Sequence, residues 1–348
     1  MISIFIKCIL FFFEIIISLQ LYITKKSSVI PMNLNKNINN SKIINFIRQN
    51  EIKRILRKIS KNLFHVNSIF ITGKAHFGNF LISINNAIIF CELFACKKII
   101  IQKNNNIFIN HTIFYPKYNI AIQPNQLIVN ENIIILNIWY FFFLDIKSLG
   151  DVNRLNILRE EILNNLPKLK THRDDLSMYI RSGDIFIVKN PIISYAQPPL
   201  CFYENILNQF KFRHVNIISE NDLNPVIPHL KKKYSYIKFK KNDLKYDIAI
   251  LANSFNIVSA ISSFIISIIK LNENIKFLWE YDSFTLRDKY HYLHPLVYSF
   301  SYNYIIYKMD ASLNYKKFMY PWLNSKEQKQ MMLIEKCKEN FTIIKSRS

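Results

Sequence analysis

The sequence has few cysteines, and they form no metal-binding pattern. Its five cysteines include no Cys-x-x-Cys pair, and neither they nor the eight histidines have the spacing of a zinc ligand set. Zinc sites in proteins need three or four such side chains, usually at close spacing along the chain. The sequence therefore argues against a zinc protein, whereas the cysteines do not decide between a reducing and an oxidising compartment.

Acidic residues are also scarce. The chain has 24 Asp and Glu against 46 Lys and Arg, a formal net charge of +22. Such an excess can indicate a nucleic-acid or anionic-membrane partner. Here the lysines are scattered among Ile, Asn, Phe and Tyr, so we expect no nucleic-acid partner. The tightest runs, 231–233 and 238–241, are expected to form a solvated face, with an acidic ligand or a membrane surface as the alternative.

The N-terminus is one long hydrophobic segment. Residues 2–23 are mostly Ile, Phe and Leu, and this length can span a bilayer. Because no small-x-small cleavage site follows closely, a signal-anchor over residues 1–26 is preferred to a cleaved signal peptide. Lys25 and Lys26 favour a cytosolic body. Three Asn-x-Ser/Thr sequons, at Asn39, Asn110 and Asn340, favour a luminal one.

The chain is long enough for two domains, with 348 residues of which 50% are hydrophobic. A stem with an amphipathic helix is expected at 27–62, and a first domain at 63–170. Ser68 to Thr72 has the pattern of a buried strand, a polar loop follows, and Leu81 to Phe94 has helical spacing. Lys98 to Gln102 is the next strand, so the order predicts a βαβ unit of a parallel sheet. Further strands are predicted at 107–109, 120–122 and 133–136, and a helix at 151–166.

Residues 171–320 repeat this alternation and are expected to form a second domain, with 321–348 as a C-terminal helix or tail. The predicted strands are 176–180, 214–218, 236–239, 256–259 and 275–279, and the predicted helices are 200–209, 227–232, 243–253 and 262–270. Polar residues gather where these strands end, which is the edge at which doubly wound sheets bind ligands. The chain is therefore expected to be an α/β protein.

Three loops between a strand and a helix carry the functional signal. They are Gly73–Asn79, Arg181–Asp184 and Ser259–Phe264. An Arg at the mouth of a strand, followed by a Gly that lets the backbone come close, suits the binding of a diphosphate. Together the three loops predict one nucleotide-sugar site.

In the same order, these loops resemble the motifs of the GDP-fucose-dependent fucosyltransferase superfamily, which includes α-1,2-, α-1,6- and protein O-fucosyltransferases. Tyr179–Asp184 is similar to its His-x-Arg-x-Gly-Asp motif, with Tyr179 in place of His. His76–Asn79 resembles its Gly-x-Gly-Asn loop, with His76 in place of the first Gly. Ser219–Asn221 resembles a strand-end Ser-Asp-Asp, and Ser262–Phe264 resembles a Ser-Ser/Thr-Phe helix start that lacks the usual aromatics after it.

The resemblance implies a GT-B glycosyltransferase, with two Rossmann-like domains facing across a cleft and the nucleotide held mainly by the second. It implies inverting, metal-independent transfer of a sugar, fucose in this family, from a GDP-sugar donor to a glycan or glycoprotein hydroxyl. The chain has no Asp-x-Asp sequence, which fits a transferase that does not hold a metal-bound diphosphate, so no metal or other cofactor is expected. A type II membrane protein facing the lumen of the Golgi or endoplasmic reticulum is expected, or a secreted one if the segment is cleaved.

Arg181 is the expected catalytic residue, because its guanidinium can donate two hydrogen bonds to the β-phosphate. The alternative is a structural salt bridge, with Asp184 as a candidate partner. Asp184 itself is expected to fix its loop or an Arg, or to be an ordinary turn residue. Ser262 and Ser263 open a helix and suit a phosphate, although plain N-capping predicts the same serines.

The other candidates have weaker signals. Gly78 and Asn79 correspond to the family's first loop, where Asn79 either caps the helix or touches donor and acceptor. His76 is either the base that takes the acceptor's proton or an exposed loop residue. Three strand-end residues are candidates for binding the nucleotide, the last two through its ribose or base: Ser219, Glu220 and Asn221. Further candidates are the carboxylates Glu280 and Asp282 and, as an acceptor platform or part of the core, the aromatic run 139–143.

Two alternatives stay open. One is a transferase that uses another nucleotide sugar. The other is a membrane-tethered inactive homologue or carbohydrate-binding protein, in which Tyr179, His76 and the missing aromatics mark the loss of a catalytic site.

Overall fold

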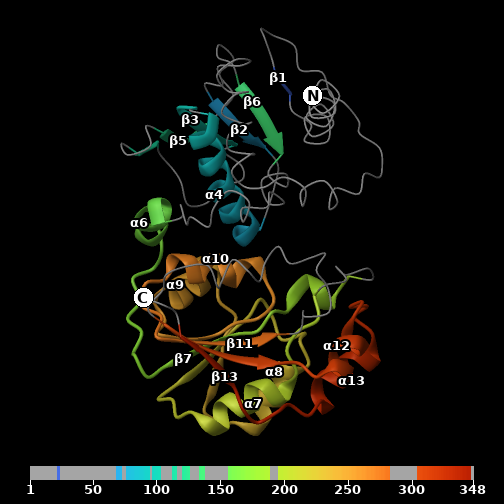
Figure 1. Ribbon diagram of the computed structural model, residues 1–348. Coiled ribbons are helices and arrows are strands. Elements are labelled where there is room, and N and C mark those ends of the chain that lie inside the picture. Colours follow the sequence, from blue (N-terminus) through green and yellow to red (C-terminus); the bar gives the residue numbers. More distant parts are fainter. Residues whose placement is uncertain are drawn as a thin grey trace. The chain divides into compact units, whose positions relative to one another are not determined.

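The computed structural model describes residues 22–23, 68–72, 76–94, 96–102, 112–115, 120–125, 133–137, 156–188, 195–282 and 304–345. The chain divides into two compact units, Met1–Ile162 (unit 1) and Leu163–Ser348 (unit 2) (Figure 1). Each unit contains its own β-sheet.

Unit 1 contains a mostly parallel six-stranded sheet, with the strand order β1-β6-β2-β3-β5-β4. The strands are β1 (Tyr22–Ile23), β2 (Ser68–Thr72), β3 (Lys98–Gln102), β4 (Ile113–Tyr115), β5 (Ile120–Asn125) and β6 (Ile133–Asn137). Helix α4 (Phe77–Phe94) connects the parallel strands β2 and β3, which confirms the predicted βαβ unit. Its apolar residues are buried at helical spacing: Phe80, Leu81, Ile84, Ala87, Ile88 and Cys91.

Several expectations for unit 1 need correction. Helix α4 begins at Phe77, so Gly78 and Asn79 lie in its first turn and not in the preceding loop. Strand β4 was not expected. Of the predicted helix 151–166, residues 151–155 lie outside the described residues, and α6 covers Asn156–Asn164. The predicted strand 107–109, the stem and most of the N-terminal hydrophobic helix lie outside the described residues. The two described residues of that hydrophobic segment, Tyr22 and Ile23, form a strand antiparallel to β6.

Among the helices within the described residues, none combines the length and the apolarity that crossing a membrane requires.

Unit 2 contains a seven-stranded sheet with the order β13-β12-β11-β10-β7-β8-β9. Its strands are β7 (Leu176–Tyr179), β8 (Val215–Ile218), β9 (Ile237–Phe239), β10 (Asn256–Val258), β11 (Phe277–Asp282), β12 (Ile305–Asp310) and β13 (Thr342–Lys345). All pairings are parallel except that of β12 with β13. Numbered along the chain, the first six strands run 3-2-1-4-5-6 across the sheet, which is the order of a doubly wound nucleotide-binding fold.

Helices cover both faces of this sheet. Helices α7 (Leu200–Gln209) and α8 (Val226–Lys233) lie on one side and α9 (Leu244–Asn253) and α10 (Ser263–Leu271) on the other (Figure 1). The strands β7, β8 and β10 are buried along their lengths because they are covered on both faces, and Val, Ile, Leu and Met predominate in them. At β11 and β12 the core is aromatic, and Trp279 stacks on Tyr307 with ring centroids 5.4 Å apart.

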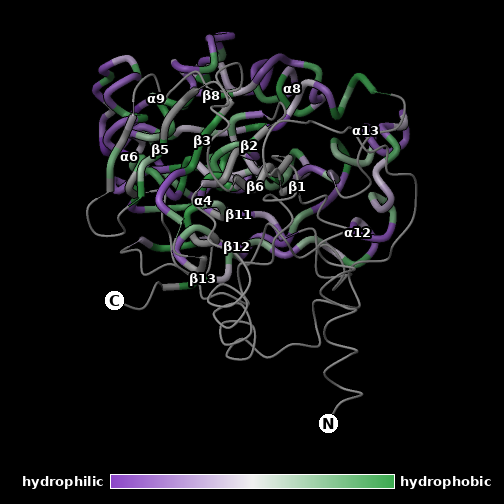
Figure 2. Tube along the Cα trace, turned by 90° about the horizontal axis from the view of Figure 1, so that it is seen from above, coloured by the Kyte–Doolittle hydropathy of each residue, from purple (hydrophilic) through white to green (hydrophobic). Residues whose placement is uncertain are grey.

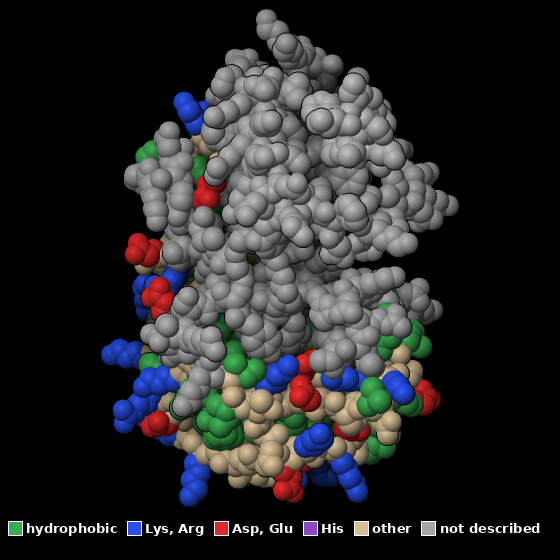
Figure 3. Space-filling model, in the orientation of Figure 1, with side chains coloured by type: hydrophobic (Ala, Val, Ile, Leu, Met, Phe, Trp, Pro, Cys, Tyr) green, Lys and Arg blue, Asp and Glu red, His purple; other side chains and the backbone are tan. Residues whose placement is uncertain are grey.

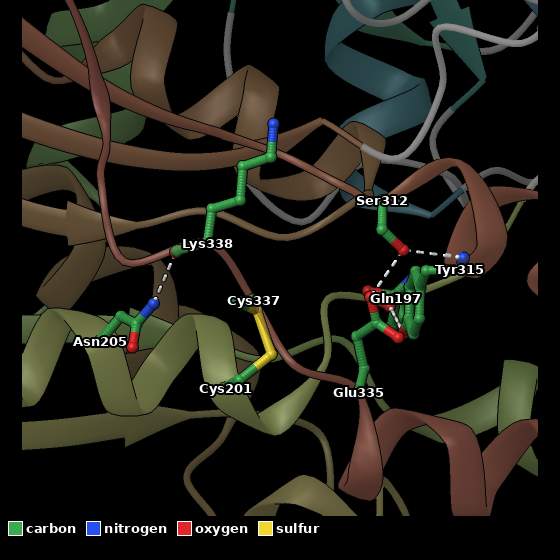
Figure 4. Close-up of a disulfide and its surroundings, with 8 residues drawn as sticks. All are labelled: Gln197, Cys201, Asn205, Ser312, Tyr315, Glu335, Cys337 and Lys338. Carbon is green, nitrogen blue, oxygen red and sulfur yellow. Dashed lines mark hydrogen bonds between the residues drawn. A yellow bond between two sulfur atoms is a disulfide. The ribbon is translucent and has the colours of Figure 1, made fainter.

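The C-terminal residues pack on unit 2: the expected C-terminal helix is present as α13, and the alternative of a tail is wrong. After β12 come α12 (Leu313–Met319), α13 (Lys326–Ile334) and the edge strand β13. A disulfide joins Cys337 to Cys201 on α7, with the Cα atoms 5.6 Å apart (Figure 4). Beside it, Asn205 Nδ2 donates a hydrogen bond of 2.9 Å to the carbonyl of Lys338. The segment before β13 is therefore tied to α7.

Removing this disulfide should destabilise unit 2. It closes a loop with a sequence separation of 136, so we expect Cys201→Ser to lower the free energy of unfolding by about 2–5 kcal/mol under oxidising conditions. The measurement is urea denaturation followed by tryptophan fluorescence, since two of the chain's three tryptophans, Trp279 and Trp322, are buried in unit 2. The difference from the wild type should vanish in excess reductant. An unchanged transition under oxidising conditions would contradict the prediction.

Candidate functional site

The candidate site of unit 2 lies at the carboxyl ends of β7, β8 and β10. Arg181 follows β7, and its side chain is 12% exposed. Nη1 of Arg181 lies 2.5 Å from Oε1 of Glu220, in the loop after β8. Nη2 of Arg181 is ion-paired with Asp184, in the 3₁₀ helix at Gly183–Phe186. The guanidinium of Arg181, which is mostly buried, therefore joins the two loops by forming ion pairs with two half-exposed carboxylates.

The protonated, positively charged form of Arg181 is stabilised by its neighbours. Burial alone would lower the pKa of its guanidinium, but Tyr179, Glu220 and Asp184 outweigh burial and raise that pKa above its ordinary value. The Nε atom is buried and has no hydrogen-bond partner among the described residues. The two carboxylates together exceed the charge of the single guanidinium, so the cluster has a formal charge of −1.

Asn221 fixes the backbone of the same two loops. Its Oδ1 accepts hydrogen bonds from Ser182 Oγ at 2.6 Å, from the Gly183 amide at 3.2 Å and from the Leu223 amide at 3.2 Å. The hydroxyl of Ser219 donates to the backbone carbonyl of Asn221 at 2.9 Å. Of the predicted set Ser219, Glu220 and Asn221, only Glu220 contacts Arg181; the other two organise the loop.

Glycine is required at position 183. Its φ is +70°, in the left-handed region, and a Cβ there would lie 1.6 Å from Oε2 of Glu220. The close approach of the backbone therefore places Glu220 beside Arg181. This is the role that the sequence pattern Arg-x-Gly-Asp predicts for its glycine, with a carboxylate as the neighbour that comes close.

Tyr179 links β7 to α10 across the point where the strand order reverses. Its phenolic oxygen lies 3.4 Å from Oγ of Ser262, and its ring centroid lies 5.2 Å from that of Phe264. Burial raises the pKa of Tyr179, so the phenol stays protonated. Ser262 is the N-cap of α10, and its Oγ accepts the Phe264 amide at 3.1 Å. The N-capping alternative for Ser262 is therefore confirmed, and Ser263 is the buried first residue of the helix.

Asp247 is a site candidate that the sequence analysis missed. It lies in the first turn of α9, its side chain is 8% exposed, and Asn242 Nδ2 donates to its Oδ1 at 2.9 Å. Burial, aided by the charges of Asp243 and Glu220, raises the pKa of Asp247 to about 6 against the Asn242 hydrogen bond. A signal was present in the sequence, because Asp247 precedes Leu251 by one helical turn on the buried face of α9.

The remaining predicted residues lie in both units and outside the cluster around Arg181. In unit 1, His76 is exposed directly before α4, and its carbonyl accepts the Phe80 amide at 2.9 Å. Asn79 does not cap α4, as one alternative had it, because the helix begins two residues earlier; its carbonyl accepts the hydroxyl of Ser83 at 2.7 Å. In unit 2, buried Asp282 pairs with Lys308 at 2.7 Å. The aromatic run 139–143 lies outside the described residues.

No group of three or more His, Cys, Asp or Glu within the described ranges is arranged to hold a metal ion.

Substitution of Gly183 tests the loop geometry. Gly183→Ala should lower the free energy of unfolding of unit 2 by about 1–3 kcal/mol, because the left-handed backbone disfavours a Cβ and Glu220 has to move. In a double-mutant cycle, Glu220→Ala should recover part of this loss. Equal losses in the presence and absence of the Glu220 side chain would show that the contact does not matter.

Substitution of Asp247 tests whether a buried charge is kept at a cost in stability. Because the folded-state pKa of Asp247 is raised to about 6, ionisation of this carboxyl opposes folding. The full cost in stability applies above pH 6 and disappears near pH 4, where the carboxyl is protonated. Asp247→Asn should therefore raise the free energy of unfolding by about 1–3 kcal/mol at pH 7.5, and the gain should fade on acidification to pH 4.

Asp243→Asn is the matched control for that measurement, because Asp243 is the exposed N-cap of the same helix and Asn caps equally well. A gain of the same size in both variants would mean that the burial of Asp247 is not the cause.

The chain was compared with known proteins. No family model matches it, and no curated protein matches it significantly. Among solved structures, it is similar to E. coli heptosyltransferase WaaC with ADP, with 10% identity over 72% of this chain and 96% of that one and a TM-score of 0.32. A TM-score this low carries no argument about fold or function. A functional proposal for this chain therefore has to be based on its own residues and on the geometry of the site.

Proposed function

We propose that the protein is a glycosyltransferase and that unit 2 binds the nucleotide of its sugar donor at the carboxyl edge of the sheet. The observation that carries the proposal is a mostly buried arginine, Arg181, whose side chain is 12% exposed, at the point between β7 and β10 where the strand order reverses. Open parallel sheets bind nucleotides outside this point.

The diphosphate is assigned to Arg181 and to the N-terminus of α10. Both terminal nitrogens of Arg181 are bonded to carboxylates, so a diphosphate has to displace at least one of them. Its two phosphates offer a bidentate partner for the guanidinium. Asp184 and Glu220 are both half-exposed, so either carboxylate can turn to solvent when it is displaced. Ser262 adds a hydroxyl and the backbone amides of a helix start.

GDP is the donor nucleotide that we propose. The guanine edge presents two neighbouring donors, N1–H and the N2 amino group, which match a carboxylate. Asp247 and Glu220 supply carboxylates at the ends of β9 and β8, the side of the sheet where the base and ribose lie in such folds. The choice of fucose as the sugar depends on the resemblance of Tyr179–Asp184 to the fucosyltransferase motif.

In the proposed reaction, an acceptor hydroxyl attacks the anomeric carbon and the bond from that carbon to the diphosphate breaks with inversion. Negative charge builds on the leaving GDP, where Arg181 lies, and no metal ion is invoked. The acceptor's proton passes to a base, for which His76 of unit 1 is our candidate, with Gly78 and Asn79 beside it. The acceptor is a glycan or glycoprotein.

We place the protein in the lumen of the Golgi or endoplasmic reticulum, held by the N-terminal hydrophobic segment. The support is the Cys201–Cys337 disulfide, since such bonds persist in oxidising compartments.

A binding protein without transferase activity is the second candidate. It is favoured by the two ion pairs of Arg181, because a guanidinium already bonded to two carboxylates can serve as a purely structural clamp.

Calorimetric titration of the full-length protein with GDP, ADP, UDP and CDP tests the nucleotide assignment. We expect GDP to bind best and Arg181→Gln to weaken it at least tenfold, about 1.4 kcal/mol. Asp247→Asn should reduce the preference for GDP over ADP. Arg213→Gln is the matched control, because Arg213 forms a two-bond ion pair with Asp175 before β7, at the opposite end of that strand.

The same variants separate the two candidates. A structural clamp predicts that Arg181→Gln lowers the free energy of unfolding and leaves the GDP affinity unchanged. Release of GDP from GDP-fucose in the presence of glycoprotein acceptors, lost in Arg181→Gln, supports the transferase. GDP binding without any release supports the binding protein. A folded protein that binds no nucleotide overturns the transferase and favours the binding protein, in which Arg181 is only a structural clamp.

A further inference from the structure

Six exposed lysines surround β9, the edge strand of the unit 2 sheet. They lie in the last turn of α8, on β9 and directly after it: Lys231, Lys232, Lys233, Lys238, Lys240 and Lys241. We name this set the β9 rim. Nζ of Lys231 lies 5.2 Å from the ring centroid of Phe239, so the helix end and the strand share one surface. The loops beside α8, β8 and α9 are hydrophilic in Figure 2.

Little negative charge balances the β9 rim. Between His229 and Tyr246 the sequence has one acidic residue, Asp243, whose carboxylate caps α9. Glu204 on α7 pairs with Lys233 at 2.8 Å. On the face drawn in Figure 3, by contrast, basic and acidic side chains of unit 2 are interspersed. The net charge of the whole chain therefore does not by itself explain a local excess at the β9 rim.

Structural reasons account for only some of these lysines. Lysines in the last turn of α8 interact well with the helix dipole, and a lysine on an edge strand prevents pairing with another sheet. Neither reason applies to Lys240 and Lys241. Nor does either explain the large side chains exposed near them, Tyr236 at 50%, Leu244 at 42% and Tyr246 at 40%.

The chemistry of this surface fits a lipid bilayer. Lysines attract an anionic headgroup layer without specific geometry, and exposed Tyr and Leu side chains suit the boundary between headgroups and acyl chains. Proteins that recognise nucleic acids commonly use the bidentate guanidinium of Arg to contact bases and phosphates. The β9 rim contains no Arg. We propose that the β9 rim docks on anionic lipid of the leaflet that faces unit 2, in addition to any contact made by the N-terminal segment.

Vesicle sedimentation of the full-length protein tests this proposal. Binding is compared between phosphatidylcholine vesicles with and without 30% phosphatidylserine, so that the apolar contact of the N-terminal hydrophobic segment, common to both, cancels. The attraction of Lys25 and Lys26 to phosphatidylserine is the same in every variant. The ratio of the two partition coefficients, with and without phosphatidylserine, is called the serine-lipid increment. We expect it to fall at least about 30-fold in the rim variant Lys232→Gln/Lys238→Gln/Lys240→Gln/Lys241→Gln. Raising the salt from 0.1 to 0.5 M should remove most of the increment in the wild type.

The matched control is Lys317→Gln/Lys326→Gln/Lys336→Gln/Lys338→Gln, four exposed lysines of unit 2 near the C-terminus. It removes the same charge and should keep the increment, and both variants should unfold like the wild type in urea. Equal losses in the two variants would show a net-charge effect and overturn the proposal. So would a rim variant that keeps the increment, or a wild type that binds RNA or heparin but shows no serine-lipid increment.

Discussion

The ion pairs of Arg181 are the interaction on which the candidate site depends. They connect the loop after β7 with the loop after β8, and Asn221 and Gly183 then set the backbone around them. The strand order supplies the constraint behind this arrangement, because it makes β7 and β8 neighbours and puts β10 on the other side of β7. Tyr179 and Ser262 continue the connection to the start of α10.

Buried and partly buried charge lowers the stability of a fold unless other interactions offset its desolvation. Asp247 is ionised at neutral pH in a place that opposes ionisation, and Arg181 is desolvated between two carboxylates. Groups perturbed in this way occur frequently at functional sites, where stability is given up for chemistry. The concentration of such groups at one sheet edge supports a ligand site there, whichever of the two candidate functions applies.

Local pattern was sufficient to predict most of the elements in unit 2. Short apolar runs bounded by polar residues marked β7 to β11 within one or two residues at most ends, because strands buried on both faces contain few polar residues. The pattern failed at the start of α4, where Gly78 and Asn79 suggested a loop but the helix already includes them. It also gave no prediction for β12, α12 and β13, which depend on packing against distant elements, although a C-terminal helix was expected where α13 lies. For the site, the motif placed Arg181 and Asp184 together, but the partner Glu220 and the buried position of Asp247 come from tertiary contacts that no local spacing records.

The position of β13 affects how the protein is made. Its partner β12 is the last parallel strand, and β13 covers that edge with residues from the final part of the chain, 342–345. Strand β13 follows β12 in the chain, so during synthesis the edge of β12 stays unpaired until β13 has also left the ribosome, while the rest of the sheet is already present. An unpaired edge is a template for association with other chains. The nascent protein therefore needs protection at β12 until β13 has emerged, and a version that lacks Thr342–Lys345 would keep that exposed edge for its whole lifetime.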